Sequence, residues 1–237
     1  MAERRITVSG DLTTDAKFKE AMKEIRDRGF IESHRKGDTG IGKTLEDELG
    51  VVENSVQAAD LGKVELKANR KNSNSKITLF TKSPDKRGVN SKVLRAKYGY
   101  QTKESRELNP NINILHTTVN GKGFNSLDGE PFMKLKEKDD KIYLEHVTDG
   151  ILEDVCWSKD NLKKAFDKKY PAKKMYHVHF SLDDMVASLM SGDLEMDIRL
   201  GVYASGNRKG KPHDNGTAFR VSPNKLDDCF AVKKKLL

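Results

Sequence analysis

Hydrophobic residues recur along this chain with two different periods, and the change from one to the other limits the fold more than any other feature. In the first fifty residues they return every three or four positions, which predicts a helix over 14–28 and a second from Ile41 to Leu49. Gly29 and Gly50 stand where these helices would end. Later segments alternate apolar and polar residues, as half-buried strands do. We therefore expect an α/β (α+β) protein.

The first strand pattern lies in 63–69. Val64 and Leu66 would point to one side of this strand, and Glu65 and Lys67 to the other. Residues 77–82 are its expected hairpin partner. Further strands are expected at 111–119, 141–147, 151–157, 174–180, 194–204 and 217–221, with helices at 90–97, after Ser158 and after Ser181. A basic, glycine-rich loop at 206–216 would join the last two strands.

Composition narrows the class of partner. The chain has 237 residues, 35% of them hydrophobic, and a formal net charge of +8. An excess of cations favours a polyanionic partner, most simply nucleic acid, although many basic proteins bind none. The two cysteines, Cys156 and Cys229, lack the spacing of a zinc site and are expected to be reduced packing residues. Without a leader or a run of membrane-spanning length, we expect a cytoplasmic protein with no membrane partner.

Residues 37–44 read GDTGIGKT and satisfy the phosphate-loop pattern of nucleotide triphosphatases. That loop requires a buried strand directly before it, yet the preceding residues, IESHRK, are polar. We therefore interpret the segment as a glycine-bearing turn that lets the next helix begin. A phosphate-release assay would exclude the triphosphatase alternative.

Asp60, Glu65 and Lys67 form the second pattern that carries chemistry. Hydrolysis of a phosphodiester needs a hard cation held by oxygen ligands, a positioned water and a positive charge near the reacting phosphate. One carboxylate at the approach to a strand, and a carboxylate and an amine two residues apart on it, supply these groups. Glu46, on the helix just upstream, offers a third carboxylate. An exposed strand face of paired charges would give the same pattern.

The C-terminal segment offers groups that read DNA bases. Arginine and lysine donate to guanine edges, aspartate accepts from a cytosine amine, and histidine or asparagine can do either. The base-reading candidates are Arg199, Lys211, His213, Asp214, Asn215 and Arg220, and those better suited to phosphates are Arg208 and Lys209. A solvated basic loop between two strands is the alternative. His177 and His179 share a strand face, where sheet packing explains them better than metal binding does.

Several blocks of this sequence resemble the MvaI/BcnI restriction endonucleases. They are GDTGIGKTLEDELG, the Asp60 to Lys67 segment, TLFTKSP, NILHTTVNG, and DIRLGVY followed by GKPHDNGTAFR. The resemblance spans most of the chain and is nearest to the MvaI branch. It implies a PD-(D/E)xK nuclease fold of the restriction-endonuclease type, with a MutH-like, two-lobed architecture and a mixed central sheet. We expect a catalytic lobe over 1–125 and a C-terminal lobe with the DNA-recognition loop over 126–237.

The resemblance also implies roles for individual residues. Asp60 and Glu65 would hold Mg²⁺, for which Mn²⁺ could substitute, and the Leu66 carbonyl would complete the metal shell. Glu46 would assist there, and Lys67 would contact the attacking water. Arg199 and Arg220 would read bases, with a cluster of Asp197, Tyr203, His213 and Asp214 around them.

The family resemblance implies an enzyme that acts as a monomer on double-stranded DNA. It would nick the two strands of a pseudosymmetric CC-x-GG type site in sequence. A cognate DNA methyltransferase would be a functional rather than a physical partner. Asn215 departs from the histidine that the MvaI branch carries, which leaves the central base pair open. The alternatives are a MutH-like repair nickase and a catalytically degenerate DNA-binding protein.

Overall fold

A computed structural model describes residues 5–37, 39–52, 59–62, 64–70, 74–170 and 182–229, with the side chains of 182 and 227–229 excepted. The chain divides into two compact units that interleave along the sequence. Unit 1 comprises 1–77, 166–180 and 223–237, and unit 2 comprises 78–165 and 181–222. The sequence boundary expected near residue 125 falls inside unit 2. The assignment of catalysis and recognition to two lobes stays a prediction.

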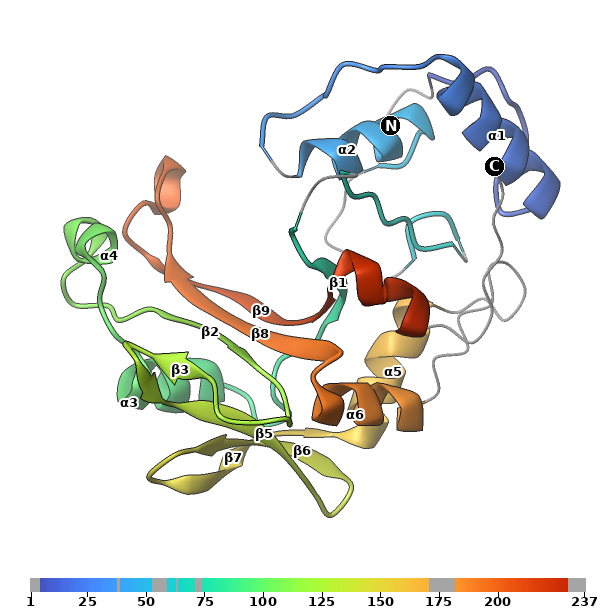
Figure 1. Cartoon of the computed structure of the whole chain (residues 1–237). Coiled ribbons are helices and arrows are strands. Elements are labelled where there is room, and N and C mark those ends of the chain that lie inside the picture. The colour runs from blue at the N-terminus through green and yellow to red at the C-terminus, as the bar shows by residue number, and fades with distance from the viewer. Residues whose placement is uncertain are drawn as a thin grey trace. The chain divides into compact units, whose positions relative to one another are not determined.

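Unit 1 is built around two helices, α1 (Asp15–Asp27) and α2 (Gly40–Glu48), which Figure 1 shows in blue. Both agree with the predicted helices, because their apolar residues are spaced to share one face. That face forms a core with the chain around them. The core comprises Ile6, Val8, Leu12, Phe18, Ala21, Leu49, Val51 and Val64, with Met22, Ile25, Leu45, Leu61 and Leu66 packed against it. A short 3-10 helix, η3 (Pro223–Cys229), also belongs to this unit.

The strand expected over 63–69 is wrong for the described part of that segment. Residues 65–70 form no strand, and the only ladder pairing nearby is an isolated bridge between Leu61 and Val64. The N–H of Leu66 donates to a side chain, Asp60 Oδ2, rather than to a strand partner. The alternation of side chains is nonetheless present, since Val64 and Leu66 contact the unit 1 core. Burial of these two residues, rather than a sheet ladder, sets the direction of Glu65 and Lys67.

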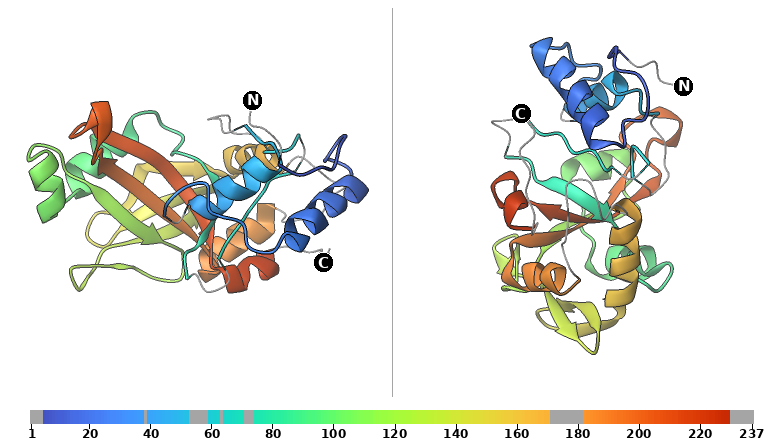
Figure 2. Two further views of the ribbon diagram at one scale, coloured as in Figure 1. Left: turned by 90° about the horizontal axis from the view of Figure 1, so that it is seen from above. Right: turned by 90° about the vertical axis from the view of Figure 1, so that its right-hand side faces the viewer.

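The main sheet of unit 2 has the strand order β1-β9-β8-β2. Its strands are β1 (Ile77–Thr81), β2 (Leu115–Val119), β8 (Leu194–Val202) and β9 (Pro212–Val221). The predicted hairpin partner of 63–69 is therefore wrong, because β1 pairs with β9. β2 and β9 both run antiparallel to β8, which lies between them. Figure 2 shows the long β8–β9 ribbon from two further sides.

The loop expected over 206–216 is shorter in the structure. A single 3-10 turn, η2 (Gly206–Arg208), and residues 209–211 precede β9, whose first residues already pair with β8. His213 lies opposite Gly201, and Asp214 lies opposite Leu200. The segment is rich in glycine and lysine, which are typical of loops, so the sequence did not predict that the strand begins here. Its consequence is that His213 and Asp214 are held by a sheet rather than by a loop.

A second sheet of unit 2 contains β5 (Met133–Lys138), β6 (Lys141–His146) and β7 (Gly150–Ser158). The predicted β6–β7 hairpin is confirmed, with Gly150 at a φ of 70° at the turn. The core of the unit includes Trp157, which is fully buried and whose indole N–H donates to the Lys82 carbonyl over 2.8 Å. Phe80 of β1 stacks on Phe219 of β9 at 4.3 Å between ring centroids.

The remaining elements of the described chain are five helices and two short strands. They are the π-helix η1 (Asn90–Arg95), α3 (Ala96–Tyr98), α4 (Lys103–Leu108), β3 (Ser126–Leu127), β4 (Glu130–Pro131), α5 (Lys159–Lys169) and α6 (Leu182–Ser191). The helices expected at 90–97 and after Ser158 and Ser181 are confirmed, the first of them largely as a π-helix. The strand expected at 174–180 lies outside the described residues. None of the described helices has the length and apolarity needed to cross a membrane.

Candidate active site and recognition face

The segment from Asp60 to Lys67 brings its polar side chains together in unit 1. Val64 is buried and Leu66 packs against the helical core, so the chain is fixed at these two points. Between them the Glu65 side chain is only 2% exposed. Asp60 is tied to the same stretch because its Oδ2 accepts a 2.8 Å hydrogen bond from the Leu66 N–H. Two carboxylates are thus held on one short length of chain.

Glu65 sits among cations. Its Oε1 accepts from Lys67 Nζ, and Lys169 Nζ lies 3.2 Å from both of its carboxylate oxygens. Burial raises the pKa of Glu65, and the negative charge of Asp60 raises it further. The positive charges of Lys67 and Lys169 oppose this rise in pKa. A buried carboxylate needs such partners to remain charged. Two negatively charged carboxylates therefore lie together here, and they attract cations.

Tyr170 lies close enough to the carboxylates of Glu65 and Asp60 for their charges to affect its pKa. Burial raises the pKa of its phenol well above the ordinary value, and the charges of Glu65 and Asp60 raise it further. Its ring stacks on Phe166 at 4.7 Å between centroids. Neither Lys169 nor Tyr170 was predicted from the sequence, because Lys169 ends a helix with several other lysines and gives no local signal. Only the fold brings it to a carboxylate 104 positions earlier in the chain.

Four of the predicted active-site residues, Asp60, Glu65, Leu66 and Lys67, are therefore adjacent in the structure. Glu46 lies half-buried on α2, and its role at the metal site stays a prediction. Within the part of the chain that the structure describes, no group of three or more His, Cys, Asp or Glu side chains could hold a metal ion. Two carboxylates and a main-chain carbonyl are the oxygen donors that this segment offers.

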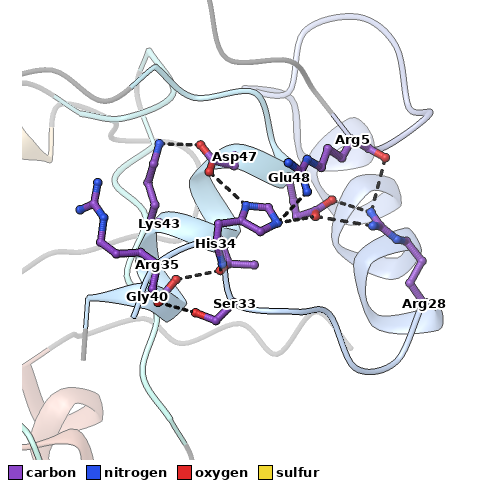
Figure 3. Close-up of polar contacts among 10 residues, drawn as sticks. Arg5, Arg28, Ser33, His34, Arg35, Gly40, Lys43, Asp47 and Glu48 are labelled. Atoms are coloured by element: carbon purple, nitrogen blue, oxygen red, sulfur yellow. Dashed lines mark hydrogen bonds and ion pairs between the residues drawn. The ribbon is translucent and has the colours of Figure 1, made fainter. Parts of the chain in front are cut away.

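The helix that carries Glu46 is anchored by a polar network (Figure 3). His34 Nδ1 lies 3.0 Å from Asp47 Oδ2, and Arg5 Nη1 lies 2.9 Å from His34 Nε2. Because a guanidinium cannot accept, Nε2 accepts from Arg5 and Nδ1–H donates to Asp47. Glu48, 1% exposed, pairs with Arg28 at 2.5 Å. These contacts fix α2 against the chain on either side of α1.

The same network shows how the phosphate-loop pattern is used. Lys43 pairs with Asp47 at 2.6 Å, and the Thr44 hydroxyl donates to the Gly40 carbonyl while accepting from the His34 N–H. The lysine and the hydroxyl that a phosphate loop would aim at a nucleotide are thus engaged in holding α2. No strand precedes the turn in residues 29–37. Asp38 lies outside the described residues. The interpretation as a helix-starting turn agrees with these contacts.

Unit 2 presents a second group of predicted residues on one side of its main sheet. Alternate residues of β2 and of β8 up to Leu200 are buried, and those between them form an open side. The register with β8 places His213 and Arg220 of β9 on the same side. This open side, which we call the polar face, carries His116, Thr118, Asp197, Arg199, His213 and Arg220. Four of these six residues were predicted, and His116 and Thr118 were missed. Their strand, β2, was predicted, but its pairing with β8 was not, because the paired residues Thr118 and Asp197 are 79 positions apart in the sequence.

Asp197 is the centre of the polar face. One carboxylate oxygen accepts from the Thr118 hydroxyl at 2.7 Å, and the other accepts from Arg220 Nη1 at 2.7 Å. Arg199 lies two residues along β8, and its Nη2 donates to the Asn215 carbonyl at 3.0 Å. Burial lowers the pKa of Arg199, while Asp197 and Asp214 oppose the change. The two arginines expected to read bases are thus held on neighbouring strands beside one carboxylate.

A β-bulge shapes the next part of β9. The register with β8 shifts between Ile198 and Leu200, which leaves Asn215 and Gly216 opposite the single residue Arg199. Gly216 has a φ of +71°, which suits a glycine, and its N–H donates to Asp214 Oδ1 at 2.7 Å. A bulge redirects the side chains beside it. Here it governs His213, Asp214 and Asn215, three residues predicted to recognise bases.

Two residues from η1 support the bulge, and neither was predicted. Asn90 is buried, and its Nδ2 donates to Asp214 Oδ2 at 2.7 Å. Arg95 Nη2 donates to the carbonyls of His213 at 2.6 Å and Gly201 at 3.3 Å, which joins β9 to β8. Both side-chain oxygens of Asp214 are therefore occupied on the protein side. The carboxylate is fixed before any ligand arrives.

The tip of the β8–β9 ribbon is basic and exposed. Tyr203 packs against His213 at 4.7 Å between ring centroids, and Arg208 lies over the Tyr203 ring at 5.7 Å. Lys209 and Lys211 are exposed in the same turn. Such exposed, solvated cations suit phosphate contacts better than base edges. His177 and His179 lie outside the described residues. Cys156 is a free, buried cysteine, as expected for a packing residue, and the side chain of Cys229 is not among those described.

Comparisons with known proteins give relatives for the whole fold. The model of the MvaI/BcnI restriction endonuclease family matches residues 19–180. The chain is similar to a solved complex of restriction endonuclease MvaI with its cognate DNA substrate, with 31% identity, 97% of this chain and 100% of that chain covered, and a TM-score of 0.82. It is also similar to MvaI in the absence of DNA, with 30% identity, 98% and 100% coverage and a TM-score of 0.59. A search of curated protein sequences found no match.

Proposed function

Because this chain belongs to the MvaI/BcnI restriction endonuclease family, we propose that it cuts both strands of DNA at a short pseudosymmetric site of the CC-x-GG type, with Mg²⁺ as cofactor. Family membership makes the chain a type II restriction endonuclease, a site-specific deoxyribonuclease. The PD-(D/E)xK interpretation fits its mixed α+β fold. The cofactor, the recognition sequence and the course of the two cuts are the parts that we propose.

The observation that carries the proposal is the cluster of Asp60, Glu65 and Lys67. Two carboxylates and an amine lie on one short segment, and Glu65 is buried with cations at both oxygens. Carboxylate oxygens and the Leu66 carbonyl are the hard donors that Mg²⁺ or Mn²⁺ prefers, and Glu46 would add a further oxygen. When bound, such an ion stabilises charge that develops on the phosphate and lowers the pKa of a water.

The protein's own groups then have separate tasks. Asp60 and Glu65 would hold the cation, and the hydrogen bond from the Leu66 N–H fixes the orientation of the Asp60 carboxylate. Lys67 orients the attacking water, and its positive charge favours the anionic phosphate nearby. Glu65 is already desolvated, so it loses little hydration when a ligand replaces its lysine contacts.

Sequence recognition belongs to the polar face and the bulge of β9. The MvaI complex contains its cognate DNA, and we propose that this chain likewise binds double-stranded DNA. Arg199 and Arg220 would donate to guanines, and His213, Asp214 and Asn215 would contact the neighbouring bases. Arg208, Lys209 and Lys211 would contact the backbone, with Tyr203 supporting them. Asn215 is the residue that we expect to set the central base pair.

We further propose that the enzyme acts as a cytoplasmic monomer that nicks one strand and then the other. A DNA methyltransferase of the same specificity would protect the host's sites. A monomer with one active site must make two separate cuts, because each strand has to be presented to the same carboxylates. Open circular DNA should therefore accumulate before linear DNA appears.

Supercoiled plasmid incubated with the pure protein and Mg²⁺ tests this function. We expect open circles, then linear product with ends at one short sequence, and no cleavage in EDTA or with Lys67→Ala. Open circles that never become linear would favour a repair nickase instead. Sequence-specific binding without cleavage in Mg²⁺ or Mn²⁺ would show a degenerate nuclease. Sequencing the product ends identifies the site and the cut position.

A further inference from the structure

Two imidazole rings converge over one glycine of the main sheet. His116 of β2 lies opposite Arg199, His213 of β9 lies opposite Gly201, and β8 runs between them. A Cβ added to Gly201 would lie 2.9 Å from Cε1 and Nε2 of His213 and 3.3 Å from Nε2 of His116. Any other residue at this position would push both rings aside. The missing side chain therefore makes the room in which they meet.

The rings belong to the polar face rather than to the core. Leu115 and Thr117, the neighbours of His116 on β2, are buried, whereas His116 itself is exposed. Strand alternation places His116 on the same side as Arg199 and Asp197. His213 is bounded on its other side by the ring of Tyr203. His116 thus extends the row of predicted base-reading side chains by one strand.

The environment of His116 favours a neutral ring. Burial lowers its pKa, the neighbouring His213 and Arg199 lower it further, and Asp197 opposes them. A neutral imidazole has one donor and one acceptor nitrogen. A group of this kind can receive or give a hydrogen bond at a base edge without adding a charge. Two imidazoles alone are a poor metal site, and the described residues supply no third ligand to complete one.

We propose that His116 is a further specificity-determining residue, which contacts a base edge in the major groove beside the base contacted by His213. The inference rests on the proposed function, since it requires that the polar face meets DNA. A two-stranded ribbon fits the major groove, and a side chain on the adjacent strand then reaches the neighbouring base pair. Gly201 keeps the two rings close enough to act on adjacent bases.

Binding to a library of duplexes with a randomised site, with Ca²⁺ in place of Mg²⁺, tests the proposal. For His116→Ala we expect a loss of about tenfold in discrimination at one base position, the size of one hydrogen bond, with the other positions unchanged. Lys136→Gln is the control, because it removes a full charge from an exposed position of the other sheet. It should leave every preference unchanged.

A base analogue separates contact from mere support. A 7-deazapurine at the affected position removes the ring nitrogen that a histidine reads. It should weaken binding of the wild-type protein by about the same tenfold factor and leave His116→Ala unaffected. Gly201→Ala, whose Cβ displaces both rings, should relax two adjacent positions together.

The outcomes are distinct. A selective wild-type protein whose preferences all survive His116→Ala overturns the inference and leaves the proposed function intact. The same holds if the analogue weakens the wild type and the variant equally. A wild-type protein that selects no sequence overturns the proposed function, and this inference with it.

Discussion

The main-chain N–H of Leu66 donates a 2.8 Å hydrogen bond to Oδ2 of Asp60. The bond links a residue anchored in the helical core to a carboxylate that has no strand to hold it. It explains how the active-site segment keeps its shape without a sheet ladder. The carbonyl of Leu66 itself, in the next peptide unit, is the one that we propose as a metal ligand.

Asp60→Asn should separate the structural role of this residue from its chemical one. Asparagine retains an oxygen that accepts from Leu66, so the melting temperature should hardly change. The lost charge should slow cleavage by on the order of 10³-fold, because several kcal/mol of charge stabilisation depend on the bound ion. Single-turnover cleavage and thermal denaturation measure the two effects. A variant that melts early and cuts normally would show that Asp60 is only structural.

Lys169→Met should have opposite effects on stability and on metal binding. Lys169 Nζ lies 3.2 Å from both oxygens of the buried Glu65, and methionine keeps the aliphatic stem but not the charge. The metal-free protein should lose about 1–2 kcal/mol of unfolding free energy. A divalent ion should bind about tenfold more tightly, because a repelling charge is gone. Calorimetric titration with Mn²⁺ is the measurement, and weaker binding would contradict the expectation.

Asn90→Asp should impair recognition without touching the active site. It would place a second carboxylate against Asp214, where Asn90 Nδ2 now donates at 2.7 Å. Repulsion should disturb the bulge and reduce discrimination between cognate and altered sites by about tenfold. Competition binding measures it, with Lys136→Gln as the control. Unchanged discrimination in a folded Asn90→Asp protein would show that the bulge needs no support from Asn90.

His116 should titrate below its ordinary value of 6.5, because burial is the largest influence on its pKa. Asp197→Asn should lower the pKa further, and Arg199→Gln should raise it. The folded state then binds fewer protons than the unfolded state, so the contribution of His116 to stability falls as pH drops below 6.5. Imidazole NMR signals followed over pH give the midpoints. A midpoint above 6.5 would contradict the expected lowering of the pKa.

The sequence predicts the helices best, because local spacing decides them. Phe18, Met22 and Ile25 mark α1, and Ile41 and Leu45 mark α2, without help from distant residues. The β6–β7 hairpin follows from its own turn in the same way. The strand at 63–69 fails because its alternation arises from burial against α1 and α2 rather than from pairing. Period alone cannot distinguish these two causes.

The site residues likewise divide into those whose grouping is local in sequence and those that depend on distant contacts. Asp60, Glu65 and Lys67 are close in sequence, so their grouping can be predicted. Lys169 and Asn90 reach their partners across more than one hundred residues, and nothing in their own segments marks them. His116 was missed for a related reason, since only the pairing of β2 with β8 shows that it shares a face with Arg199. Contacts of this range depend on topology.

Glu65→Gln gives the most direct test of a metal-dependent nuclease centred on Asp60, Glu65 and Lys67. Cleavage of cognate DNA in Mg²⁺ and binding of the same DNA in Ca²⁺ should be measured on one preparation. We predict that the variant binds within about threefold of wild type, while its single-turnover cleavage falls on the order of 10³-fold. Cleavage by Glu65→Gln at the wild-type rate would contradict the assignment of this site.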